Sequence, residues 1–159
     1  MMNKSISETT LQQFRTISRL YSDTSAFMHE AIARKAGLSG TDHKYLGLIL
    51  QHKSITAGEI SKLTGLTTGA VTGLIDRLEK KNLLERQFTK DDRRKVIIVP
   101  NVNNSMKLLK PIFDKLQEKT VKLISTFSTE EIQTIERYFT EAIAIMKETT
   151  DSLNNNQND

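Results

Sequence analysis

The chain of 159 residues contains no cysteine. Disulfide bonds, thiolate metal sites and redox sensing through cysteine are therefore all excluded. No apolar run approaches the ~20 residues that a membrane span requires. The first residues, MMNKSISETTLQQF, also lack the apolar stretch of a secretory signal. We therefore expect a cytoplasmic protein that has no membrane partner.

Signatures of catalysis are also missing. The sequence has no P-loop, dinucleotide fingerprint, HExxH zinc motif or catalytic-triad pattern. The three histidines, His29, His43 and His52, fall on the first two predicted helices without the spacing of metal ligands. We expect no enzyme, no catalytic residue, no cofactor and no metal site. With 37% hydrophobic and 26% charged residues, the chain should instead fold as a single domain over residues 1–159.

Positive charge is present, and it is concentrated in the middle of the chain. Residues 53–95 hold ten Lys/Arg against six Asp/Glu, a surplus of four that equals the net charge of +4 of the whole chain. A localised basic surface suits a polyanion such as DNA, because each neutralised phosphate releases counterions. An ordinary solvated surface explains the charge alone equally well.

The first third of the sequence has helical periodicity. Apolar residues recur at helical spacing from Leu11 to Ile32 and predict one long helix that ends near Gly37. A second helix is predicted over residues 42–52, with Thr41 as its N-cap.

Two further helices are predicted in the middle of the chain. Thr56 and Glu59 have the spacing of a capping box, in which each side chain binds a free backbone N–H of the other residue. The short helix that follows stops at Gly65. After a tight turn, another helix is predicted over residues 67–81, capped by Thr67.

The pattern then changes to that of strands. Residues 84–88 and 95–99 are β-prone, and the polar turn TKDDRR between them predicts a hairpin that Pro100 closes. Helical periodicity resumes over residues 106–124, and again after the capping box formed by Ser128 and Glu131.

The expected fold is mainly α with a small β-hairpin wing. A winged helix-turn-helix core occupies residues 41–100, and residues 8–36 and 102–150 form flanking helices. These outer helices carry more apolar surface than the small core can cover, so we expect them to intertwine with a second copy of the chain. The alternative is a bundle within one chain. The tail, residues 153–159, is rich in Asn and is expected to be disordered.

The start of the helix at residues 67–81 carries the candidate base-reading residues. In a helix-turn-helix the second helix enters the major groove, with its N-terminal residues against base edges. Thr68 and Thr72 point away from the apolar face, and the small Gly69 and Gly73 let the helix approach DNA closely. A plain cap followed by a tight turn is the alternative for this segment.

Basic residues further along are candidates for backbone and groove contacts. Arg77 can reach phosphate, and its alternative is an ion pair within the helix to Asp76 or Glu79. At the hairpin tip, an acidic residue can fix an arginine through a bidentate pair and direct it into a minor groove. A solvated turn is the alternative there.

Together these features resemble one family. LTTGAVTGLIDRLEKKNLLERQFTKDDRRKVIIV, residues 66–99, closely resembles the winged-helix core of the MarR family (multiple antibiotic resistance regulators). The order of flanking helices fits over about residues 8–150. The resemblance implies a homodimer whose two winged helices read an inverted-repeat operator in double-stranded DNA, usually as a repressor. It also implies a possible small-molecule effector.

The resemblance assigns roles to individual residues. The wing motif of the family is Asp-x-Arg followed five residues later by Leu-Thr. Asp92 and Arg94 match its first part, which implies Arg94 in the minor groove and Asp92 as its orienting partner, whereas Pro100-Asn101 replaces Leu-Thr. Asn101 can still cap the next helix. The candidate DNA-binding residues are Thr67, Thr68, Ala70, Thr72, Arg77, Arg93, Arg94 and Lys95.

An effector pocket is harder to locate. In the family it lies between the dimerisation layer and the winged helix, where Tyr21, Phe27, Tyr45 or Phe113 would line it; each is better explained as a core residue. Some members respond to zinc, which makes His43 a metal candidate, although a packed or solvated histidine is the favoured interpretation.

Two other functions fit a winged helix. One is a module for protein contacts, and the other is an architectural protein that binds DNA without a specific operator. The local positive charge and the arginines of the wing favour DNA over protein contacts. The ratio of specific to nonspecific binding would identify an architectural role.

Overall fold

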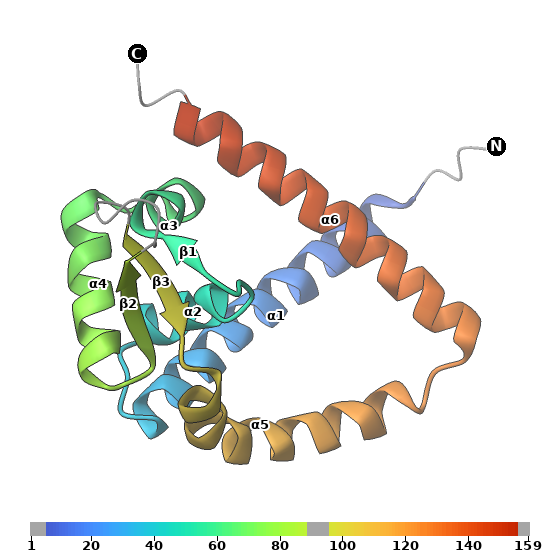
Figure 1. Cartoon of the computed structure of the whole chain (residues 1–159). Helices are drawn as coiled ribbons and strands as arrows, with labels where there is room; N and C mark the ends of the chain where they lie inside the picture. The colour runs from blue at the N-terminus through green and yellow to red at the C-terminus, as the bar shows by residue number, and fades with distance from the viewer. Residues whose placement is uncertain (1–5, 89–95, 156–159) are drawn as a thin grey trace.

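The computed structural model describes residues 6–88 and 96–155 of the chain (Figure 1). The helices are α1 (Glu8–Lys35), α2 (Gly40–Ile49), α3 (Ala57–Thr64), α4 (Thr68–Lys80), α5 (Val102–Ile124) and α6 (Thr129–Asn155). The strands are β1 (Ile55–Thr56), β2 (Leu84–Phe88) and β3 (Val96–Pro100). The expected class, mainly α with a small hairpin wing, is confirmed.

The three strands form one antiparallel sheet in the order β1-β3-β2. Strands β2 and β3 are the predicted hairpin, with Leu84 opposite Pro100 and Phe88 opposite Val96. The second strand ends at Pro100, one residue later than predicted. Strand β1 was not predicted, because two residues carry no periodicity; it is held by pairing of Ile55 with Ile98.

A single hydrophobic core holds the winged helix together. It is built from one face of α2, α3 and α4 and from the inner side of the sheet, and the end of α1 and the start of α5 cover it. Its buried residues include Leu46, Ile49, Ile60, Leu74, Ile75, Leu78, Leu84 and Ile98. The apolar positions predicted on one face of the 67–81 helix are all buried, as their spacing requires: Val71, Leu74, Ile75 and Leu78.

The predicted helix starts are confirmed except for one. Thr56 and Glu59 form the capping box of α3, Thr67 caps α4, and Asn101 caps α5. Helix α2, however, begins at Gly40 with Ser39 as its N-cap, and not at residue 42 with Thr41 as cap. The Ser39 side chain accepts a hydrogen bond of 3.0 Å from the Asp42 N–H. Ser39 therefore occupies the extended cap position, two residues earlier than predicted.

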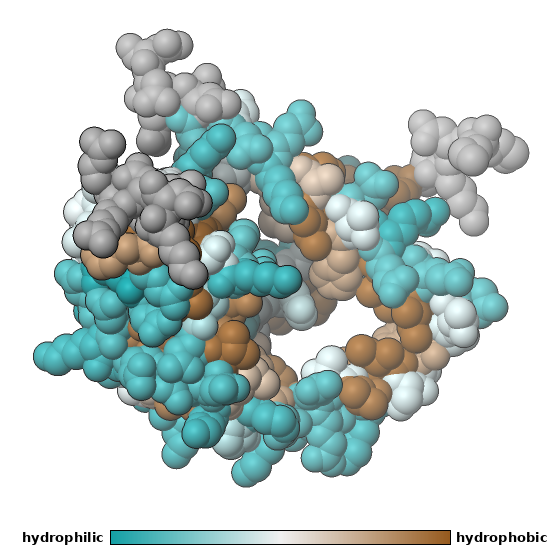
Figure 2. All heavy atoms as spheres, in the orientation of Figure 1, coloured by the Kyte–Doolittle hydropathy of each residue, from teal (hydrophilic) through white to brown (hydrophobic). Residues whose placement is uncertain are grey.

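The outer helices do not close into a bundle. Helix α6 crosses α1, and the crossing has an edge-to-face contact between Phe14 and Tyr138 with ring centroids 5.0 Å apart. None of the side chains of residues 129–154 is buried. In Figure 2 hydrophobic atoms border the opening between α5 and α6. Tyr21 and Phe27 were expected in the core, but they are exposed in the single chain.

The C-terminal helix is longer than expected. It continues to Asn155, so residues 153–155, which were assigned to a disordered tail, are helical. Residues 156–159 lie outside the described part of the chain. None of the helices in the described ranges has an apolar stretch long enough to cross a membrane.

Candidate nucleic-acid interface

Helices α3 and α4 form a helix-turn-helix with a well-defined turn. Gly65 ends α3 in the left-handed conformation (φ +70°), which glycine adopts without steric cost. The Ser61 hydroxyl donates to the Leu66 carbonyl at 2.6 Å, and the Thr64 hydroxyl accepts from the Leu66 N–H at 3.2 Å. The turn is thus tied back to α3, and Thr67 caps the next helix by accepting from the Ala70 N–H.

The first turns of α4 are open to solvent. Thr67, Thr68, Ala70 and Thr72 are all exposed, while the opposite face of α4 is buried against the core. A Cβ atom added at Gly69 would meet nothing within 4 Å beyond the neighbouring backbone of α4. The exposed start of α4 is therefore a face of small polar and apolar groups that can approach another molecule closely. This exposure is the placement that the sequence predicts for these positions.

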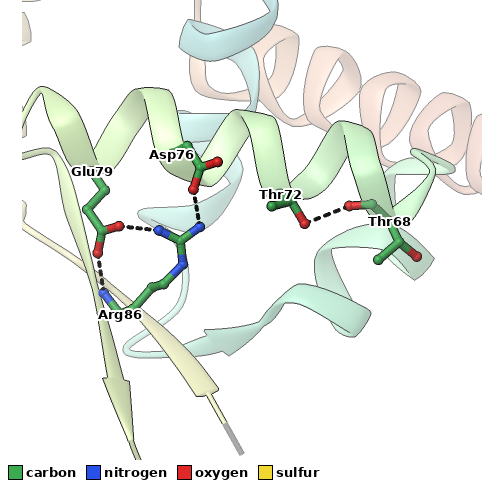
Figure 3. A network of polar contacts seen from close by, with 5 residues as sticks. All are labelled: Thr68, Thr72, Asp76, Glu79 and Arg86. Carbon is green, nitrogen blue, oxygen red and sulfur yellow. Dashed lines mark hydrogen bonds and ion pairs between the residues drawn. The ribbon is translucent and has the colours of Figure 1, made fainter.

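One threonine hydroxyl of this face is already used within the helix. The Thr72 hydroxyl donates to the Thr68 carbonyl at 3.0 Å (Figure 3). A hydroxyl has one proton and two lone pairs. In this conformation Thr72 therefore offers an acceptor oxygen and a methyl group, but no donor, to a partner.

The exposed row of α4 continues into two carboxylates that bind an arginine of the wing. Figure 3 shows Asp76 and Glu79 on the same side of α4 as Thr72, with the Arg86 side chain of β2 reaching toward them. The guanidinium is ion-paired with both carboxylates. The Arg86 backbone N–H also donates to Glu79 Oε1 at 3.0 Å. Burial lowers the pKa of Arg86, but the hydrogen bonds and charges of the two carboxylates outweigh this, so its pKa is raised.

Arg77 points away from this row and binds α2. Its Nε donates to both carboxylate oxygens of Asp42 at 3.1 Å, and its Nη2 donates to Oδ1 at 2.8 Å. Asp42 is only 3% exposed, whereas the Arg77 side chain is 52% exposed. The hydrogen bond with Asp42 raises the pKa of Arg77. The predicted alternative partners of Arg77, Asp76 and Glu79, bind Arg86 instead, because Arg77 lies on a different side of the helix.

The four candidates of the predicted wing tip, Asp92, Arg93, Arg94 and Lys95, lie outside the described residues.

The sequence analysis did not single out Asp42 and Arg86, two residues that hold α4 through ion pairs. Asp42 is 35 residues from its partner Arg77 in the sequence, and Arg86 is 10 residues from Asp76. Residue spacing within one helix or strand does not indicate contacts of this kind. The sequence showed only that the two partners of each pair carry opposite charges; the fold is what brings them together.

Two of the three histidines come close together. The rings of His29 and His43 are 5.6 Å apart between centroids, and His43 stacks on Phe113 at 6.2 Å. Burial lowers the pKa of His43, the nearby His29 lowers it further, and Glu30 acts in the opposite direction. In the described ranges, 6–88 and 96–155, no cluster of three or more His, Cys, Asp or Glu side chains is arranged to hold a metal ion. His43 is thus a packed histidine between α1 and α5.

The helix-turn-helix, its exposed second helix and the adjacent β-hairpin define a winged helix-turn-helix protein. A sequence model described as MarR family matches residues 36–95. The chain is 36% identical over 148 residues to the HTH-type transcriptional regulator YcgE of Bacillus subtilis, covering 93% of each chain. It is 30% identical over 128 residues to the HTH-type transcriptional regulator MhqR of the same organism, covering 80% of this chain and 87% of MhqR. The chain belongs to the MarR family of DNA-binding transcriptional regulators.

Solved structures show the same fold. A MarR family protein from Bacillus stearothermophilus superposes with a TM-score of 0.71 at 21% identity, covering 90% of this chain and 99% of that protein. A mutant of MepR from S. aureus, bound to an oligodeoxyribonucleotide, superposes with a TM-score of 0.56 at 22% identity, covering 89% and 99%. At these identities the likeness concerns the fold.

Proposed function

We propose that this regulator is a repressor that binds an inverted-repeat operator as a homodimer. The observation that supports it best is the combination of one exposed helix start, suited to a single half-site, with outer helices that expose large hydrophobic side chains. A two-fold dimer places two such helices on DNA about one helical turn apart. The oligodeoxyribonucleotide complex of the MepR mutant is consistent with DNA as the partner.

The apolar surface of the outer helices supports the dimer. Helices α1, α5 and α6 expose large hydrophobic side chains, among them Phe14, Ile17, Leu20, Tyr21, Val121, Ile124, Phe139, Ile143 and Met146. A monomeric soluble protein rarely exposes contiguous apolar surface of this kind. We propose that a second copy of the chain covers this apolar surface. Because the outer helices flank the winged helix, such a dimer also brings two winged helices together.

The DNA contacts we propose follow the sequence. Thr67, Thr68, Ala70 and Thr72 approach the major groove, and the half-exposed Arg77 reaches phosphate with the part of its guanidinium that Asp42 leaves open. Because the Thr72 proton is bonded to Thr68, we assign Thr72 an accepting or methyl contact with a base. For the wing, the resemblance supports Arg94 in the minor groove, oriented by Asp92, with Arg93 and Lys95 beside it.

Further parts of the proposal follow from family membership. We propose a cytoplasmic location, no catalytic activity, and release from DNA by a small-molecule effector. Tyr45 and Phe113 are partly buried beside the core, and they support a pocket between the outer helices and the winged helix. Tyr21 and Phe27 would join such a pocket only where a second chain covers them.

One pair of experiments tests the proposal. Light scattering at micromolar concentration should give about twice the 18.0 kDa chain mass. Selection from a random duplex library should then enrich a two-fold symmetric sequence. A stable monomer would remove the basis for an inverted repeat. A dimer that enriches no sequence would favour the architectural alternative, in which the protein binds DNA without an operator.

A further inference from the structure

We propose that Arg86 permits DNA binding by neutralising Asp76 and Glu79, two carboxylates that otherwise face the DNA beside the reading positions of α4. Arg86 acts through these two residues and makes no DNA contact of its own. It is therefore a positioning residue of the interface. The proposal rests on the proposed use of the exposed face of α4 for DNA.

The first step is the placement of the carboxylates. Thr68, Thr72, Asp76 and Glu79 follow one another at spacings of four, four and three residues, so they share one face of the helix (Figure 3). The Asp76 side chain is 59% exposed. A helix that lays Thr68 and Thr72 into a groove therefore brings these carboxylates toward the phosphates at the groove edge.

The second step is the fixed position of Arg86. It lies in the middle of β2, opposite Ile98 of β3, so the sheet holds its backbone. Its side chain is only 29% exposed, and its two terminal nitrogens are each paired with a different carboxylate. The bond from its backbone N–H to Glu79 fixes that carboxylate from a second direction. Both terminal nitrogens of the guanidinium are thus bonded to side chains of α4.

The third step is the charge balance. With Arg86 the three side chains carry one negative charge, and without it they carry two, which are unpaired and next to a polyanion. Repulsion between exposed charges weakens with added salt, since the screening length falls from about 10 Å at 0.1 M to about 3 Å at 1 M. A loss of affinity caused by unpaired carboxylates is therefore greatest at low salt, and it is independent of base sequence.

The test is whether removing the carboxylates removes the need for Arg86. Four proteins are compared: wild type, Arg86→Gln, the double variant Asp76→Asn/Glu79→Gln, and the triple variant that combines all three changes. Each is titrated against a mixed-sequence duplex of about 30 base pairs and against the sequence selected above. We expect Arg86→Gln to weaken both by about tenfold at about 50 mM salt and by less at about 200 mM. The triple variant should bind within about threefold of the double variant.

Arg137→Gln is the matched control, because it removes one exposed arginine from the polar face of α6, opposite Phe139; it should leave affinity within about twofold. An equal loss from Arg86→Gln in both backgrounds would mean that Arg86 contacts DNA directly, and would overturn the proposal. Unchanged affinity of Arg86→Gln would overturn it too, leaving a purely structural role.

Two further outcomes keep the test decisive. If Arg86→Gln fails to fold, the double variant still tests the proposal. It should bind both duplexes several-fold more tightly than wild type, because it removes two negative charges beside the DNA. Weaker binding would contradict the proposal. A wild-type protein that binds both duplexes equally would argue against a specific operator. It would leave the Arg86 result intact, because the predicted effect concerns phosphate charge alone.

Discussion

Asp76 and Arg77 are neighbours in α4, yet they bind opposite flanks of the winged helix. Asp76 pairs with Arg86 of β2, and Arg77 pairs with Asp42 of α2. Successive side chains on a helix point about 100° apart, so the pair that looks natural in the sequence does not form. Helix α4 is instead held on two sides by ion pairs, one to β2 of the wing and one to α2, which precedes the helix-turn-helix.

The pair between Arg77 and Asp42 should matter for stability. Arg77→Ala leaves a carboxylate that is 3% exposed without its partner, and we expect a loss of about 1–3 kcal/mol in the free energy of unfolding in urea. Arg19→Ala is the control, because its pair with Asp23 spans 4.0 Å between exposed side chains and should contribute close to nothing. Equal effects of the two substitutions would contradict a role for the buried carboxylate.

The DNA contacts should separate into two classes. Replacing Arg77 by Gln should weaken binding to all duplexes alike and reduce the salt slope of log K by roughly 1, since phosphate contacts carry no sequence information. Replacing Thr68 or Thr72 by Ala should instead change the ranking of operator variants, by about 1–3 kcal/mol per altered base pair. Titrations at two salt concentrations measure both. Uniform losses for the threonine variants would show that α4 positions the protein without reading bases.

The wing prediction comes from the sequence resemblance. Arg94→Ala should weaken operator binding most where the flanks are rich in A·T pairs, because narrow minor grooves concentrate negative potential. Asp92→Ala should weaken binding indirectly by releasing the arginine. Operators with A·T-rich and G·C-rich flanks provide the comparison. Affinities unchanged by both substitutions would refute the assigned roles.

Stability should fall in mild acid because of His43. Its pKa is lowered from the ordinary value of 6.5 by burial and by His29, with Glu30 opposing. Below pH 6.5 the unfolded chain therefore takes up a proton on this histidine before the folded chain does, and the unfolding free energy decreases until the folded pKa is passed. His43→Gln should flatten the part of the profile just below pH 6.5 in urea titrations. A slope unchanged by the substitution would assign the effect to other groups.

The proposed dimer can be weakened on one face of α6. Ile143 shares a helical face with Phe139 and Met146, whereas Glu148 lies on the opposite, polar face. Ile143→Lys should shift the mass measured by light scattering from about twice the chain mass toward 18.0 kDa. Glu148→Lys introduces the same side chain on the polar face and should leave the mass unchanged. Dissociation by both variants would point to general charge effects.

Elements with strong local signals were predictable, and contacts between distant elements were not. The capping boxes, the hairpin and the buried face of α4 follow from residue spacing, which directly reflects backbone geometry. The cap of α2 was misplaced because Ser39 and Thr41 are both good cap residues in the sequence, and in the structure Ser39 is the one that accepts the backbone N–H of Asp42. Arg86 was not predicted as a functional residue because its ion pairs with Asp76 and Glu79 form only when β2 packs beside α4.

The open arrangement of α6 has a consequence for how much protein a cell must make. Residues 129–154 bury no side chain within one chain, so little within the protomer opposes unfolding of this helix. If its apolar face is covered by a second copy, mass action applies, and the melting temperature should rise with protein concentration. Occupancy of an operator would then depend on the cellular concentration of the protein more steeply than for a monomer, since two chains must assemble before they bind DNA.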